Sequence, residues 1–142
     1  MPFRFAILTI LLGVLLSAGI AVAGQAAGSS AKPQSARSPV TITDQDNSTN
    51  VDLTTGELLV VKLPSNPSTG YDWSVSGDPA PLKLTKHSHL RSTSGAVGAP
   101  QTAVFEFRAA SAGVVHLTLL YRRSWEYNVP PVKTFTVTVE VR

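Results

Sequence analysis

The histidines are the residues of this chain whose type and spacing come nearest to a metal site. His87 and His89 are separated by a single residue. On a β-strand alternate side chains share a face, so both rings would point the same way. Imidazole nitrogens bind zinc, but two ligands do not make a site, and no carboxylate neighbours the pair in the sequence. The sequence therefore predicts no metal and no cofactor.

Residues 44–50 begin like a calcium-binding loop, with Asp, Asp, Ser and Asn at alternate positions. The loop of an EF-hand needs glycine where this chain has Thr49, and a bidentate glutamate where it has Thr55. We interpret the segment as a polar turn.

Signals for catalysis are weak throughout the chain. Cysteine is absent, which removes thiol nucleophiles, disulfides and thiolate metal sites together. The sequence contains no Gly-x-Ser-x-Gly motif, no phosphate-binding loop and no carboxylate pair at a suggestive spacing. The net charge is only +3, and no run of basic residues is longer than Arg122-Arg123, so a nucleic-acid partner is not expected either. We predict that the protein is not an enzyme.

The N-terminal segment has the pattern of an export signal. Arg4 precedes an apolar run over residues 6–20, and Ala21-Val22-Ala23 offers a small-residue cleavage site. Residues 1–23 are therefore predicted to be a signal peptide, which places the protein in the periplasm or the medium with no membrane contact after cleavage. Residues 24–39, rich in Ala, Ser, Gly and Pro, are predicted to be a flexible leader.

From residue 40 onward the alternation of apolar and polar residues is typical of short β-strands. No segment after the signal shows a helical period, and Pro and Gly fall between the strands. We therefore predict one all-β domain over residues 40–142, an immunoglobulin-like antiparallel β-sandwich of seven to eight strands without a disulfide, in which Trp73 packs on aliphatic side chains. The predicted strands cover residues 40–43, 51–53, 58–63, 71–76, 82–89, 102–108, 114–121 and 134–141.

Three loops interrupt this regular pattern, and a sandwich collects alternate loops at one end. The first loop, residues 64–71, carries two prolines and a glycine and should be stiff and uncharged, although a rigid connector would look the same. The second loop, residues 91–101, is small, polar and contains glycine. The third loop, residues 122–131, holds Trp125 and Tyr127, which could form an interface or the rim of the core.

In this order the three loops resemble those of the chagasin-like family of cysteine protease inhibitors. Asn66-Pro67-Ser68-Thr69-Gly70-Tyr71 is similar to the family's Asn-Pro-Thr-Thr-Gly-Tyr/Phe motif. Tyr121-Arg122-Arg123-Ser124-Trp125-Glu126 resembles its Arg-Pro-Trp loop, with Ser124 in place of proline. For the middle Gly-x-x-Gly loop, Gly98-Ala99-Pro100-Gln101 fits if Gln101 replaces the last glycine, and Gly95-Ala96-Val97-Gly98 is the other frame.

The resemblance implies a protease inhibitor. Because the first loop carries no thiol or reactive electrophile, we expect the inhibition to be reversible and non-covalent, and we expect the protein to act as a monomer. Its partner would be a papain-like cysteine protease, with the first loop entering the active-site cleft and the other two gripping its sides. The alternative is an exported adhesion or carbohydrate-binding domain that stacks Trp125 and Tyr127 on a ligand. The protease-binding residues implied by the resemblance are Asn66, Pro67, Ser68, Thr69, Gly70, Tyr71, Gly98, Ala99, Pro100, Arg122, Arg123 and Trp125.

Overall fold

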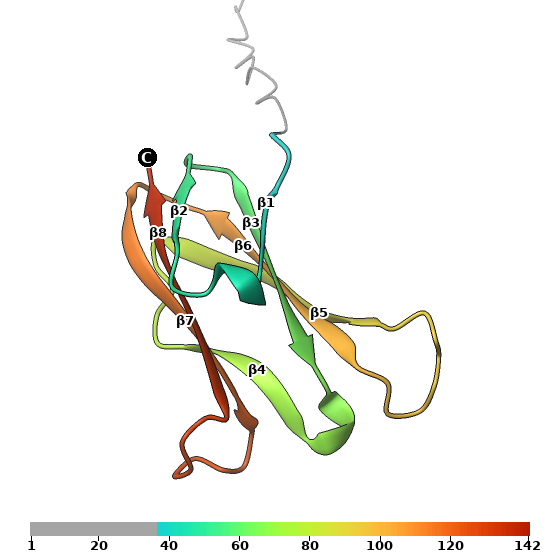
Figure 1. The fold of residues 1–142 in the computed structure, drawn as a ribbon. Helices are drawn as coiled ribbons and strands as arrows, with labels where there is room; N and C mark the ends of the chain where they lie inside the picture. The colour runs from blue at the N-terminus through green and yellow to red at the C-terminus, as the bar shows by residue number, and fades with distance from the viewer. Residues whose placement is uncertain (1–36) are drawn as a thin grey trace, which may run out of the picture. The chain divides into compact units, whose positions relative to one another are not determined.

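The computed structural model describes residues 37–142 (Figure 1), so the predicted signal peptide and most of the predicted leader lie outside the described residues. Among the described residues, no helix is long or apolar enough to cross a membrane. They form eight strands and two short 3-10 turns: β1 (Val40–Thr43), η1 (Asp44–Asp46), β2 (Asn50–Leu53), β3 (Leu58–Ser65), η2 (Pro67–Thr69), β4 (Tyr71–Ser76), β5 (Leu82–Arg91), β6 (Gln101–Ala109), β7 (Gly113–Arg123) and β8 (Lys133–Val141).

The strands form two four-stranded sheets, ordered β1-β3-β6-β5 and β2-β8-β7-β4. Alternate residues of the central strands point between the sheets, so the apolar positions of the sequence pattern become the core. Its largest fully buried side chains include Phe105, Phe107 and Phe135. Burying aromatic side chains of this size contributes a large share of the folding free energy, which matters in a chain without disulfides. The predicted all-β sandwich is confirmed.

Two edge strands run parallel to their neighbours, so the sheets are mixed rather than purely antiparallel. β1 pairs with β3, placing Val40 opposite Leu59, and β2 pairs with β8. Periodicity fixes which face a side chain takes but not the direction of its partner strand. Between β1 and β2, η1 carries the chain from one sheet to the other, and the Asp46 carboxylate accepts a hydrogen bond from the Thr43 N–H at 2.8 Å. That contact agrees with a polar turn at this position.

A bulge in β5 explains why its alternation is less clear in the sequence. Leu82 and Leu84 lie opposite buried residues of β6, but the register shifts between Leu84 and Lys86. After the shift His87 and His89 take the same inner face. One extra residue in a strand moves every later side chain to the other face, so the bulge places the two histidines toward the other sheet.

Both ends of the described chain lie at one end of the sandwich, and the three loops lie at the other (Figure 1). The Arg37 guanidinium donates to the Thr54 hydroxyl at 2.8 Å, and the neighbouring Thr55 N–H donates to the Arg142 carbonyl at 2.9 Å. The loop end is therefore remote from both chain ends.

Candidate functional site

The first loop is a turn that satisfies its own hydrogen bonds. The Asn66 carbonyl accepts from the Thr69 N–H at 3.1 Å and from the Thr69 hydroxyl at 2.6 Å. The Gly70 N–H donates to the Pro67 carbonyl at 2.9 Å, and Gly70 ends the turn at a φ of +81°, which favours glycine. Two prolines and these internal bonds leave the turn few alternative conformations, in agreement with the stiffness predicted from its composition.

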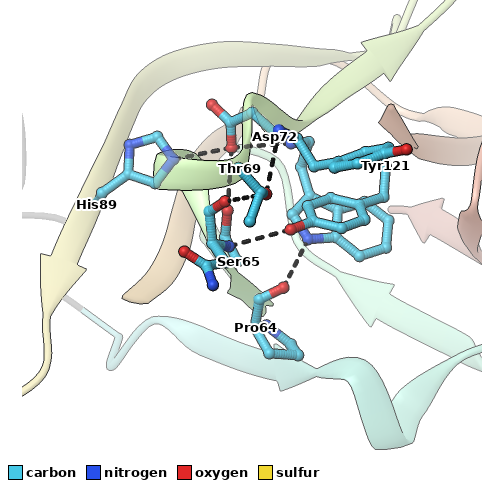
Figure 2. A network of polar contacts seen from close by, with 9 residues as sticks. Pro64, Ser65, Thr69, Asp72, His89 and Tyr121 are labelled. Atoms are coloured by element: carbon cyan, nitrogen blue, oxygen red, sulfur yellow. Dashed lines mark hydrogen bonds and ion pairs between the residues drawn. The ribbon is translucent and has the colours of Figure 1, made fainter. Parts of the chain in front are cut away.

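The base of the first loop is held by two aromatic side chains of the sheet behind it (Figure 2). The Tyr121 hydroxyl accepts a hydrogen bond from the Asn66 N–H at 3.0 Å, and the Trp73 indole N–H donates to the Pro64 carbonyl at 2.9 Å. Trp73 is buried, as predicted, but its ring packs on Tyr121 at 5.1 Å between centroids rather than only on aliphatic side chains. The two side chains therefore hold the backbone at Pro64 and at Asn66, just before the turn begins.

Replacing Tyr121 with phenylalanine should loosen this anchor. The Asn66 N–H would lose its acceptor, and a partly buried donor left without a partner costs about 1–2 kcal/mol. We expect urea denaturation to show a loss of that size for Tyr121→Phe, with the m-value unchanged. Tyr127→Phe is the matched control, because Tyr127 is 77% exposed; an equal loss in both variants would contradict the anchoring role.

The third loop lies directly against the first. A Cβ built on Gly70 would come within 2.5 Å of the Trp125 ring, so the indole lies across the glycine. The Arg123 guanidinium sits over the Tyr71 ring at 4.5 Å, and its Nε donates to the Thr69 carbonyl at 3.4 Å. Trp125 is 62% exposed. It is therefore a surface side chain supported by the first loop, and not a rim of the core.

The second loop occupies residues 92–100, between β5 and β6. A hollow of about 220 Å³ separates it from Ser68 of the first loop. Gly95 and Gly98 both have positive φ, while Gln101 already belongs to β6, where it pairs with Ser65. The first loop is thus the centre of the group, with the second loop across a hollow on one side and the third loop in contact on the other.

Beside the first loop, Asp72 of β4 meets the histidines of β5 across the gap between the two sheets. Its Oδ1 accepts from the Ser65 hydroxyl at 3.2 Å and the Trp73 N–H at 2.8 Å, and lies 2.8 Å from His89 Nε2 (Figure 2). His87 stacks on Phe105 with the ring centroids 4.1 Å apart. Partial burial lowers the pKa of His87, and the Asp72 carboxylate opposes that shift only in part.

Sequence reasoning missed this cluster, because Asp72 is 17 residues from His89 and lies in the other sheet. The only signal was the placement of both histidines on one face, which their ring separation of 5.1 Å supports.

The loop end can bind a partner by shape more readily than it can perform chemistry. Ser68 and Thr69 are exposed at its uncharged tip, and Trp125 adds a large apolar surface beside them. Aromatic side chains and backbone groups held in advance are typical of tight protein–protein contacts.

Comparisons with known proteins agree with this reading. Residues 52–139 match the model of the chagasin family peptidase inhibitor I42. Chagasin from Trypanosoma cruzi is 30% identical over 101 residues, covering 68% of this chain and 92% of that protein. Amoebiasin-2 from Entamoeba histolytica is 25% identical over 103 residues, covering 71% of this chain and 84% of that protein. The crystal structure of a cysteine protease inhibitor from Entamoeba histolytica superposes with a TM-score of 0.66 at 25% identity, covering 72% and 95% of the two chains. The proteins described in these matches are inhibitors rather than enzymes.

Proposed function

From the premise that this chain belongs to the chagasin family of cysteine protease inhibitors, we propose that it is an exported, reversible inhibitor of papain-like cysteine proteases. Its first loop fills the active-site cleft and blocks the catalytic cysteine and histidine from substrate. The observation that carries the proposal is the self-bonded turn from Asn66 to Gly70, which lies between the other two loops.

The turn is suited to binding without being cleaved or modified. It holds its shape through the Thr69 and Gly70 hydrogen bonds before any partner arrives, so little conformational entropy is lost on docking. The chain contains no cysteine, and the turn offers only amide, hydroxyl and proline groups, so the block is non-covalent. It acts by filling the cleft, by backbone hydrogen bonds and by excluding water from the catalytic pair.

The flanking loops grip the walls of the cleft. Trp125 packs its exposed face on an apolar wall of the cleft while its other face lies on Gly70. The indole is therefore already held in position before binding and loses little conformational freedom. Arg123, held by Tyr71 and by Glu126 at 3.3 Å, serves the rim. Gly98, Ala99 and Pro100 of the second loop, together with Arg122, complete the contact, and one inhibitor molecule acts as a monomer on one protease.

Export through the N-terminal signal peptide would bring the inhibitor to proteases outside the cytoplasm. The domain contains no cysteine to be oxidised there, and it relies on core packing instead of disulfides.

Titration against papain tests the proposal. We expect nanomolar papain to lose activity in proportion to added inhibitor until one equivalent is present. Activity should return when the complex is diluted or the inhibitor is competed away, and the recovered inhibitor should be intact by mass spectrometry. Trypsin, a serine protease, is the specificity control. Full activity of both papain and cathepsin L in excess inhibitor would overturn the proposal and favour the sugar-binding alternative.

A further inference from the structure

Asp72, His87 and His89 form a cluster with the composition of a metal site. One ligand atom from each lies within 4.8 Å of the other two. The chain has three histidines and no cysteine, so this cluster holds two of its three imidazoles beside a carboxylate. Histidine nitrogens and carboxylate oxygens are the ligands that zinc uses in three-ligand sites, with water in the fourth position.

The cluster is held from outside in the way that metal ligands usually are. All three hydrogen-bond contacts of the Asp72 carboxylate found among residues 37–142 are made by Oδ1, from Ser65, Trp73 and His89, which fixes the orientation of the group with Oδ1 facing His89. Phe105 supports the plane of the His87 ring from below. Such supporting contacts fix the orientation of metal ligands and raise their affinity.

The distances are close to those of a tetrahedral zinc site. Zinc bonds of about 2.0–2.1 Å place two ligand atoms roughly 3.3 Å apart. The pair formed by His89 Nε2 and Asp72 Oδ1, at 2.8 Å, needs to open slightly, and His87 needs to close. One face of the His87 ring stacks on Phe105 and the residue is otherwise exposed, so the ring can shift toward the other two ligands within its own plane without disturbing the core.

We propose that Asp72, His87 and His89 bind one zinc ion, or a transition-metal ion of similar preference, which joins β4 to β5. Both strands are edge strands of their sheets, and no backbone ladder connects the two sheets there. The metal replaces the proton shared by His89 and Asp72 and adds a third bond from His87. It therefore clamps the sandwich beside the roots of the first and second loops. Hard cations such as Mg²⁺ and Ca²⁺, which prefer oxygen ligands, are excluded by the two imidazoles.

Calorimetric titration of the purified protein with zinc chloride tests the site. We expect one zinc ion per chain with a micromolar dissociation constant, and a rise in Tm with zinc but not with magnesium or calcium chloride. His87→Ala and Asp72→Asn should each weaken zinc binding by about tenfold or more. Asp72→Asn keeps an oxygen that can accept the Ser65 and Trp73 hydrogen bonds, and His87→Ala leaves the contact between His89 and Asp72 in place, so both variants should fold.

His116→Ala is the matched control, because His116 is the remaining histidine and contacts Thr138 of β8 instead. Its zinc affinity should equal that of the wild type. The proposal fails if zinc does not bind in the micromolar range, if His87→Ala binds as tightly as the wild type, or if His116→Ala loses binding as well. The experiment contains no protease, so its outcome is independent of the proposed inhibition.

Discussion

Replacing Thr69 with arginine will abolish inhibition of papain. Thr69 is exposed at the tip of the first loop, where the proposed complex leaves room for a short side chain only. Arginine is longer by several atoms and brings a charge that must be desolvated inside the cleft. We expect the inhibition constant to rise by a thousandfold or more, which is about 4 kcal/mol. The measurement is a papain titration with a fluorogenic peptide substrate.

The same substitution at a position outside the loops tests whether the loss of inhibition comes from blocked entry into the cleft or from the added charge alone. Thr41 is exposed on β1, an edge strand that is not joined directly to any of the three loops. Thr41→Arg should inhibit papain as the wild type does. Circular dichroism should show both variants folded, since Thr69 gives up two side-chain hydrogen bonds, to the Asn66 carbonyl and from the Tyr71 N–H, and no core contact. Undiminished inhibition by Thr69→Arg would place the first loop outside the cleft.

Gly70→Ala is expected to weaken inhibition by about 2–3 kcal/mol, roughly 30- to 150-fold, although it adds a single methyl group. The new Cβ meets the Trp125 ring at 2.5 Å, so the indole must leave its resting place. A non-glycine residue at a φ of +81° also carries about 1 kcal/mol of backbone strain. One change thus disturbs the end of the turn and the side chain beside it. Inhibition constants and thermal unfolding measure the two effects separately.

Gly77→Ala supplies the matched control. Gly77 has a similar φ of +73°, and no atom lies within 4 Å of its added Cβ. It should lose comparable stability and retain full inhibition. A double-mutant cycle with Trp125→Ala, itself expected to cost about 2 kcal/mol, adds a second check. With the indole gone, Gly70→Ala should cost only the strain; strict additivity of the two losses would show that the ring and the glycine do not act together.

Much of the fold could be predicted from alternation alone. The strands over Val40–Thr43 and Tyr71–Ser76 have the predicted bounds, and β8 differs by one residue, because each has a buried face with clear period-two spacing. β5 was harder to predict, since the bulge at Thr85 reverses which residues face inward. The parallel pairing of β1 with β3, and of β2 with β8, leaves no trace in the spacing of apolar residues.

The candidate site likewise has features that could be predicted from local sequence and features that could not. The stiffness of the first loop follows from Pro67 and Gly70, which act on the backbone within a few residues. The contacts of Tyr121 with Asn66 and of His89 with Asp72 join positions 55 and 17 residues apart, and those contacts depend on strand order and register. Local sequence patterns do not encode either one. Those long-range contacts are the parts of the site that only the three-dimensional arrangement reveals.

Arg142 lies beside Thr55, at the end of the sandwich opposite the first loop. The chain after β8 is therefore a suitable point of attachment. A linker placed there could attach the protein to a bead or to a carrier protein while the three loops face outward. Under the proposed reversible inhibition, such a tethered form should capture active cysteine proteases from a mixture and release them with their activity intact.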